Sequence, residues 1–266
     1  MFLGISMDNL DILMGPKLGD FISSLVVPAY YYYITGRKTN LYISEYYDKF
    51  TTSLERTYEE LKPILLNQKY ISSFEIFDHT KHALDHNLND FRINDLVSTR
   101  PFWAVFLHTA FKYEPTIPNN FETLKWRKDE SYSDYLVVDR KDLFEFNDFI
   151  KDQYLHVFSQ FDKKVFVTFD KKQYDSFPLK DHLELKLVDT IDEQLAILNG
   201  SKMNMLNCSA ALCMATALNT PRIIETGKWL NIHYALDYLN FDNVETFDNE
   251  EVISPNPKYL KANLHA

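Results

Sequence analysis

Apolar positions in the first third of the chain alternate between short continuous runs and longer stretches of helical periodicity. The short runs are typical of buried strands, and the periodic stretches are typical of amphipathic helices. Strands are predicted at 10–14, 41–43 and 72–77, and helices at 21–34 and 45–67. Strand–helix–strand–helix–strand is the order of a parallel sheet with right-handed crossovers.

A second cycle of the same kind follows a polar stretch. Residues 101–111 predict a buried helix, and residues 114–133, with two prolines and Asn119-Asn120, predict a linker. Strands are then predicted at 135–138, 164–169, 183–187, 203–206 and 222–224, and helices at 142–160, 191–198, 210–218 and about 228–239. We therefore expect an α/β protein of two domains with a cleft between them, spanning 1–128 and 129–245, and a tail at 246–266.

Composition narrows the class of protein. The 266 residues carry a formal net charge of −10, which argues against strong electrostatic binding of nucleic acid or acidic membranes. Cys208 and Cys213 lie five residues apart on a predicted helix, so we expect free thiols in a reducing compartment. Without an apparent signal peptide or an apolar stretch of roughly 20 residues, the expected location is the cytoplasm.

The first predicted strand ends in a loop that carries Gly19 and Asp20. Glycine permits close approach of the backbone, and aspartate is a favourable residue at a helix N-terminus. In α/β folds ligands bind beyond the carboxyl ends of strands. Asp20 is therefore either a helix N-cap alone or a carboxylate at the mouth of a cleft, available as a general base.

Residues 78–86 contain three histidines and two aspartates. His79 and His82, or His82 and His86, can share a helix face, and such groups bind zinc when four ligands converge. No independent fourth ligand follows from the spacing. A polar loop near the cleft is the favoured interpretation, and no metal site is assigned.

Ser209, Ala210 and Ala211 open the small-residue helix of the second half. Small residues leave the free amides of a helix N-terminus accessible to a diphosphate, and the serine adds a hydroxyl donor. The alternative is that the alanines permit close packing of the helix on the sheet.

Two stretches resemble the heptosyltransferase-like branch (ADP-heptose:LPS heptosyltransferases) of the GT-B glycosyltransferases. Residues 18–25, Leu-Gly-Asp-Phe-Ile-Ser-Ser-Leu, are similar to the first loop of that family. Residues 191–224 resemble its helix–strand–helix–strand segment. The matching positions are Ser209, Ala215, Ala217, Leu218, Thr220 and Pro221, whereas Cys208, Ala210, Ala211 and Cys213 replace the family's Asp, Gly, Pro and His.

The resemblance implies two Rossmann-like domains and transfer of a sugar from a nucleotide-sugar donor. It implies that Asp20 is the catalytic base and that basic residues near Arg140 and Lys141 neutralise the donor phosphates; an exposed loop pair is the alternative. Thr226 and Gly227 follow the last predicted strand, where they can hold phosphate or ribose. The implied reaction inverts the anomeric carbon and uses no metal or cofactor.

The acceptor implied by this reading is a glycan, a lipid-linked glycan or a modified nucleobase. One alternative is a degenerate GT-B-like module that binds a nucleotide or glycan without turnover. Another is a viral glycosyltransferase acting on modified DNA bases, which a basic groove at Arg92, Arg100, Lys125, Arg127 and Lys128 would favour. A nucleotide-sugar epimerase or dehydrogenase is disfavoured because the chain has no Gly-x-Gly-x-x-Gly motif.

Overall fold

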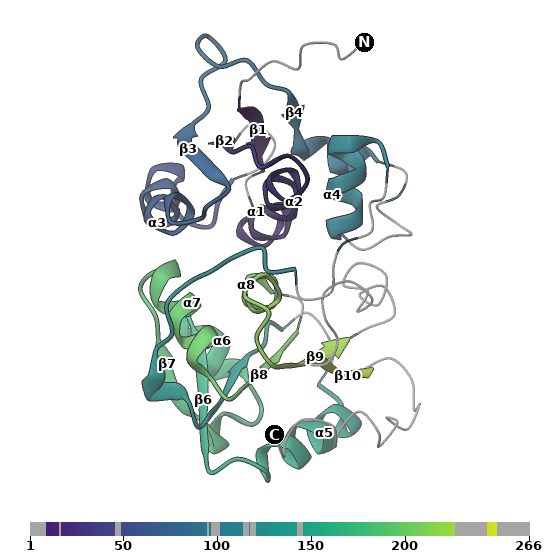
Figure 1. The fold of residues 1–266 in the computed structure, drawn as a ribbon. Helices are drawn as coiled ribbons and strands as arrows, with labels where there is room; N and C mark the ends of the chain where they lie inside the picture. The colour runs from purple at the N-terminus through teal and green to yellow at the C-terminus, as the bar shows by residue number, and fades with distance from the viewer. Residues whose placement is uncertain are drawn as a thin grey trace.

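The protein contains two parallel sheets, each accompanied by helices (Figure 1). The computed structural model describes residues 9–15, 17–45, 49–94, 96, 102–113, 117, 121–142, 146–207, 209–226 and 244–248. The expected α/β class with two Rossmann-like sheets is confirmed. Within the described part of the chain, no helix combines the length and the apolar character needed to cross a membrane.

The first sheet has the order β3-β2-β1-β4, with every pair parallel. Its strands are β1 (Leu10–Met14), β2 (Thr39–Ile43), β3 (Ile71–Ile76) and β4 (His86–Asn87). Its helices are α1 (Leu18–Ser24), α2 (Val26–Thr35), α3 (Leu54–Leu66), the short 3₁₀ helix η1 (Leu88–Ile93) and α4 (Phe102–Phe111).

The second sheet has the order β10-β9-β8-β5-β6-β7, again all parallel. Its strands are β5 (Tyr135–Asp139), β6 (Lys163–Thr168), β7 (Glu184–Leu187), β8 (Met203–Leu206), β9 (Arg222–Thr226) and β10 (Val244–Asp248). The helices are η3 (Glu130–Tyr132), α5 (Asp148–Phe158), α6 (Lys171–Ser176), η4 (Lys180–His182), α7 (Ile191–Gly200) and α8 (Ala210–Ala217).

Helix ends show where local sequence signals acted as expected and where they did not. Gly36, with φ of 71°, ends α2 as predicted. The N-cap of α1 is Lys17, so Asp20 lies inside the first turn and the interpretation of Asp20 as an N-cap is wrong. The single helix expected at 21–34 is two helices that meet at Leu25, because Pro28 has no N–H to bond the carbonyl of Ser24.

Two other expected elements differ from the structure, and a third cannot be compared. The helix expected from residue 45 begins at Leu54, where the Ser53 side chain accepts the backbone N–H of Arg56. Strand β10 continues the second sheet past residue 245, where the tail was expected to begin. The helix expected at about 228–239 lies outside the described residues.

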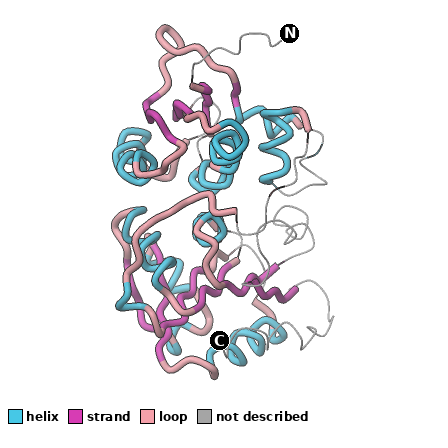
Figure 2. The backbone as a smooth tube through the Cα atoms, in the orientation of Figure 1, coloured by secondary structure: helices cyan, strands magenta, loops and turns pink. Residues whose placement is uncertain are grey.

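Helices lie between the two groups of strands (Figure 2). Helix α1 packs on α8 and α3 packs on α7, so the two halves meet through helices. A single cluster of buried apolar side chains contains residues from both halves, among them Phe21, Leu61, Leu195 and Leu212. The core is therefore continuous from one sheet to the other.

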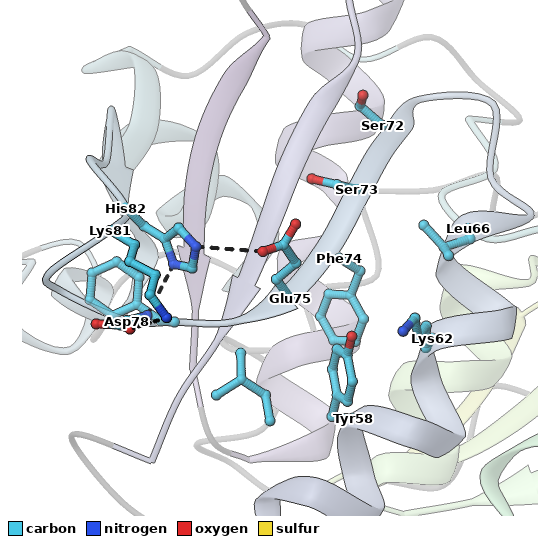
Figure 3. Close-up of a pocket in the computed structure, with 12 residues that line it drawn as sticks. Tyr58, Lys62, Leu66, Ser72, Ser73, Phe74, Glu75, Asp78, Lys81 and His82 are labelled. Carbon is cyan, nitrogen blue, oxygen red and sulfur yellow. Dashed lines mark hydrogen bonds and ion pairs between the residues drawn. The ribbon is translucent and has the colours of Figure 1, made fainter.

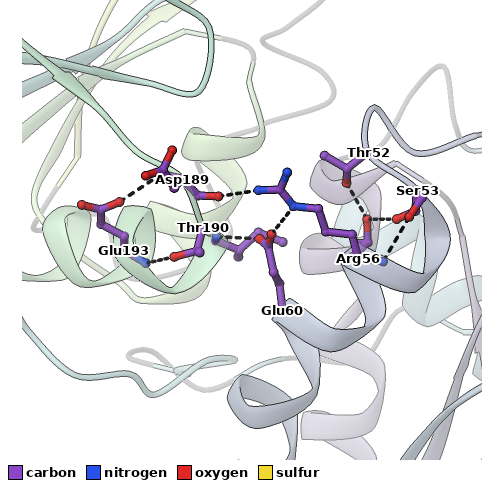
Figure 4. A network of polar contacts seen from close by, with 9 residues as sticks. Thr52, Ser53, Arg56, Glu60, Asp189, Thr190 and Glu193 are labelled. Carbon is purple, nitrogen blue, oxygen red and sulfur yellow. Dashed lines mark hydrogen bonds and ion pairs between the residues drawn. The ribbon is translucent and has the colours of Figure 1, made fainter.

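A polar network closes the α3–α7 side of this interface (Figure 4). Arg56 donates to the backbone oxygen of Asp189 at 2.7 Å and to Oε1 of Glu60 at 2.7 Å. The other carboxylate oxygen of Glu60 accepts the backbone N–H of Ile191, the first residue of α7, at 2.9 Å. A carboxylate from one half thus stabilises the positive end of a helix in the other.

Candidate functional site

Each sheet has one place where the strand order reverses, and the candidate residues gather at these two places. In the first sheet the order reverses between β1 and β4, and in the second between β5 and β8. Ligands of open α/β sheets bind in the crevice at such a switch point, beyond the carboxyl ends of the strands. Asp20 follows β1, whereas Lys141 follows β5 and Ser209 follows β8.

Asp20 forms an ion pair with Arg92 at the first switch point. The guanidinium lies 2.6 Å from Oδ2 of Asp20, and the two side chains are 18% and 31% exposed. Arg92 also donates to Oδ1 of Asn89 at 3.4 Å and lies over the ring of Phe91. The arginine is therefore held on three sides, and its charge is directed at the carboxylate.

Gly15 at the end of β1 makes this arrangement possible. A Cβ at position 15 would stand 2.1 Å from Oδ1 of Asn89 and 3.5 Å from the guanidinium of Arg92. Asn89 is itself buried, so its side chain has little room to move away. From the sequence, Arg92 is a candidate only for a basic groove, because it lies 72 positions from Asp20 and no local pattern connects the two.

The second switch point is organised by Asn207. Its Oδ1 accepts the backbone N–H of Lys141 at 2.9 Å, and its Nδ2 donates to the carbonyl of Lys141 at 2.7 Å. Asn207 is fully buried, whereas Lys141 is exposed. The loop after β5 is thereby fixed against the loop after β8, with the lysine directed to solvent.

Ser209 is the N-cap of α8, at the helix start that the sequence predicts. Its Oγ accepts the backbone N–H of Leu212 at 3.3 Å. The following residue, Ala210, lies against α1: a Cβ on Gly19 would be 3.6 Å from Cα of Ala210 and 3.3 Å from Sγ of Cys213. The small residues therefore pack helix on helix, and they bring the residue before Asp20 to the N-terminus of α8.

Arg140 and Lys141, expected as a pair, point in different directions. Arg140 is 4% exposed and donates to both carboxylate oxygens of Glu225, at 2.7 and 2.9 Å. The hydroxyl of Tyr154 donates to Glu225 at 2.9 Å, and burial together with the charge of Glu225 raises the pKa of Tyr154 well above 10. Arg140 is thus engaged in a buried ion pair, and Lys141 is the member of the pair that faces solvent.

Asp139, which sequence reasoning missed, is the last residue of β5 and is 5% exposed. Burial raises its pKa from 3.8 to about 6, against the opposing effects of the Lys141 charge and of hydrogen bonds from Ser209 and Gln194. Gln194 Nε2 lies 3.3 Å from Oδ2 of the carboxylate. The position of an acidic residue at the end of a strand can be read from the sequence. Its contact with Gln194 of α7 cannot, because it depends on the fold.

Two predicted donor-site residues lie partly or wholly outside the described structure. Thr226 ends β9, and its side chain is not among those described. Gly227 lies outside the described residues, as does Cys208.

The histidine-rich segment lies on the other side of the first sheet from α1. Nδ1 of His82 accepts the backbone N–H of Asp78 at 3.0 Å, and its Nε2 lies 3.5 Å from Glu75. An open groove of about 740 Å³ runs here between β3 and α3, with Glu75 and Lys62 among its lining residues (Figure 3). Among the described residues no group of three or more His, Cys, Asp or Glu side chains could hold a metal ion.

Three of the residues proposed for a basic groove are paired with acids. Arg92 binds Asp20, Lys125 lies 3.0 Å from Glu122, and Arg127 forms an ion pair with Asp192. Lys128 is exposed, and Arg100 lies outside the described residues. In the described part of this set, most of the positive charge is therefore compensated by neighbouring carboxylates.

Comparison with solved structures places the fold. The chain superposes on E. coli ADP-heptose LPS heptosyltransferase II with a TM-score of 0.60 and 8% identity, over 95% of this chain and 96% of that one. It superposes on a glycosyl transferase family 9 protein from Veillonella parvula with a TM-score of 0.59 and 11% identity, over 92% and 87%. For E. coli heptosyltransferase WaaC with ADP, the TM-score is 0.59 and the identity 10%, over 91% and 93%.

No family model matches the sequence, and no curated protein sequence matches it. At these identities the superpositions show the fold alone. The chain has the two-sheet GT-B-like fold that the sequence analysis expected.

Proposed function

We propose that this protein is a glycosyltransferase that moves a sugar from a nucleotide-sugar donor to an acceptor hydroxyl. One observation carries the proposal: the helix that follows β1 contacts the helix that follows β8, where Gly19 meets Ala210. Asp20, next to Gly19, and the N-terminus of α8 are thereby neighbours. A base and an anion-binding helix terminus on opposite sides of one site suit the displacement of a nucleoside diphosphate.

The donor diphosphate is proposed to bind at the N-terminus of α8. The backbone N–H groups of the first turn, near Ala210 and Ala211, meet the phosphates at the positive end of the helix dipole. Ser209 supplies a hydroxyl, and Lys141 supplies the positive charge. Arg140 acts differently in this proposal: its ion pair with Glu225 holds the loop that presents Lys141.

Asp20 is proposed to take the proton of the acceptor hydroxyl as it attacks the anomeric carbon. A single base without an enzyme nucleophile gives inversion. The leaving diphosphate is stabilised by the α8 terminus and Lys141, without a metal ion or cofactor in the proposed scheme. Two of the neighbours carry ADP or act on ADP-heptose by their titles, and an ADP-sugar is accordingly the first donor to test.

The test combines ligand binding with turnover. Wild type, Asp20→Asn and the control Asp152→Asn, which changes an exposed carboxylate on α5, are screened by thermal shift against nucleoside diphosphates and nucleotide sugars. A donor should stabilise all three proteins. With that donor and an acceptor, Asp20→Asn should lower turnover by roughly 100-fold or more. Absence of stabilisation by any nucleotide would refute the proposal.

A binding module without turnover is the second candidate, because Arg92 neutralises the carboxylate that would act as base. In that case a nucleotide sugar would stabilise the protein but would be neither transferred nor hydrolysed. Equal stabilisation of wild type and Asp20→Asn, with no diphosphate released by either, would favour the module.

A further inference from the structure

Two buried oxygen atoms beside the proposed donor site accept no hydrogen bond from the described residues. They are Oδ1 of Asp139 and Oε1 of Gln194. The two side chains are neighbours, since Nε2 of Gln194 lies 3.3 Å from Oδ2 of Asp139, and their residues are 5% and 3% exposed. Buried polar atoms without partners are uncommon and call for an explanation.

One added proton satisfies both atoms. A carboxylic acid protonated on Oδ1 has an O–H to donate, and Oε1 of Gln194 is the acceptor that lacks a donor. An O–H on Oδ1 would supply the donor that Oε1 lacks, beside the existing bond from the Gln194 amide to Oδ2. Burial already raises the pKa of Asp139 to about 6, so little further free energy is needed to protonate it near neutral pH.

Ser209 connects this pair to the donor site. Its Oγ accepts the N–H of Leu212, and its hydroxyl lies beside Asp139, where a hydrogen bond from Ser209 lowers the pKa of the carboxyl group. While Asp139 is ionised, the hydroxyl proton is committed to the carboxylate. When Asp139 is neutral and bonded to Gln194, the hydroxyl of Ser209 can turn to an oxygen of a bound phosphate.

The charges around Asp139 come from several elements. Lys141, on the loop after β5, lowers its pKa. Tyr154 on α5 is uncharged near neutral pH, because its own pKa is raised well above 10. Arg140 is compensated by Glu225 on β9. A diphosphate at the N-terminus of α8 therefore adds negative charge near the buried carboxylate. This charge disfavours the ionised form and favours uptake of a proton.

We propose that Asp139 is a positioning residue for the donor: it takes up one proton from solvent when a diphosphate binds at α8, and it thereby releases the hydroxyl of Ser209 to the phosphate. This inference rests on the proposed donor site. It adds a specific property of that site, namely that donor binding is coupled to protonation of a residue that the ligand does not touch.

Isothermal titration calorimetry of the full chain tests the coupling. The probes are ADP-glucose, UDP-glucose and GDP-mannose, because their diphosphate diesters do not titrate near neutral pH. Each titration is run at pH 7 in two buffers of different ionisation enthalpy, which gives the number of protons bound. Wild type should take up close to one proton per donor, and its affinity should fall about tenfold between pH 7 and pH 8.

Three variants assign the effect. Asp139→Asn should bind the donor with no proton uptake and no such dependence on pH. Asp142→Asn, which removes an exposed carboxylate three residues away, should keep the uptake of wild type. Ser209→Ala should keep the uptake and weaken donor binding by roughly tenfold, the loss of one hydrogen bond to a charged group.

Donor binding to wild type without proton uptake would overturn the inference and leave the proposed function intact, and this result does not depend on whether any variant folds. Unchanged uptake in a folded Asp139→Asn protein would overturn it equally. Binding of none of the three probes would refute the donor site itself, and the inference with it.

Discussion

The guanidinium of Arg92 lies 2.6 Å from the carboxylate of Asp20, in a pair that joins the segments following β1 and β4. Asn89 and Phe91 hold the arginine in this position. The carboxylate of Asp20 is thereby oriented by a partner from another segment of the chain.

Replacing Arg92 should therefore lower turnover. In Arg92→Gln the carboxylate of Asp20 loses its ion pair and the orientation that the pair fixes, so kcat/KM should fall by roughly tenfold. Arg92→Lys, which keeps the positive charge, should lose less. The matched control is Arg127→Gln, which removes a more exposed arginine paired with Asp192 and should leave kcat/KM unchanged. An unchanged kcat/KM in Arg92→Gln would show that this ion pair does not position Asp20 for the reaction.

The Arg140–Glu225 pair should affect the stability of the protein, whereas Lys141 should affect donor binding. Glu225→Gln leaves the buried charge of Arg140 without its counter-ion, so we expect a loss of roughly 3–5 kcal/mol in the free energy of unfolding. Lys141→Ala should leave this free energy nearly unchanged and weaken donor binding. Denaturant unfolding and calorimetric titration measure the two effects. A large loss of stability in Lys141→Ala would contradict the exposed position of that side chain.

Asp139 should make stability depend on pH. Its pKa is raised in the folded protein, from 3.8 to about 6, so its ionisation opposes folding. The protonated carboxyl group adds about 3 kcal/mol to the free energy of unfolding. This stabilisation is complete below about pH 4 and is lost as the pH rises through 6. The difference in unfolding free energy between Asp139→Asn and wild type should accordingly shift in favour of the variant from pH 4 to pH 8. If this difference is independent of pH, the pKa of Asp139 is not raised in the folded protein.

Gly200 should tolerate no side chain. A Cβ there would stand 2.1 Å from the backbone oxygen of Asp129, where the segment joining the two halves crosses the end of α7. Gly200→Ala should cost about 2–3 kcal/mol, since backbone must move. Gly36→Ala is the control: nothing lies within 4 Å of the added atom, and only the positive φ of 71° opposes alanine, at roughly 1 kcal/mol. Thermal unfolding measures the stability of both variants. If Gly200→Ala and Gly36→Ala lose the same stability, the backbone contact at Gly200 is not as close as described.

Glu60 should matter more than its neighbour Glu59. Glu60 accepts hydrogen bonds from Arg56 and from the first N–H of α7, whereas Glu59 is exposed on the same helix. Glu60→Ala should lower the free energy of unfolding by about 1–2 kcal/mol, and Glu59→Ala should change it little. If chemical denaturation gives both variants the same midpoint, the network of Figure 4 does not stabilise the protein.

The order of elements could be predicted because each buried strand is a short apolar run and several helices carry their own end signals. Thr190 caps α7 and Ser209 caps α8, and each stands directly before a helix that the sequence predicts. The start of α1 has no such signal, because Lys17 provides no side-chain cap and the aspartate that suggested one lies within the first turn. Pro28 marked the division of the first long helix but was not used.

The candidate site was predictable only in part, because its partners are distant in sequence. Asp20 and Ser209 stand at local motifs, and a motif can be recognised within a few residues. Arg92 reaches Asp20 only through the neighbouring positions of β1 and β4, and Glu225 reaches Arg140 from β9. No local pattern showed that Arg140 would be buried while Lys141 stays exposed. Such outcomes depend on which strands become neighbours, and that is a property of the whole fold.

The contact of Gly19 with Ala210 also limits how the protein can move. Neither residue has a side chain that can rotate, so the spacing of α1 and α8 is set by backbone atoms and cannot be adjusted by changing rotamers. The continuous core behind this contact opposes a rigid-body hinge between the halves. A ligand that contacts both helices would therefore meet a spacing that changes in side-chain rotamers cannot alter.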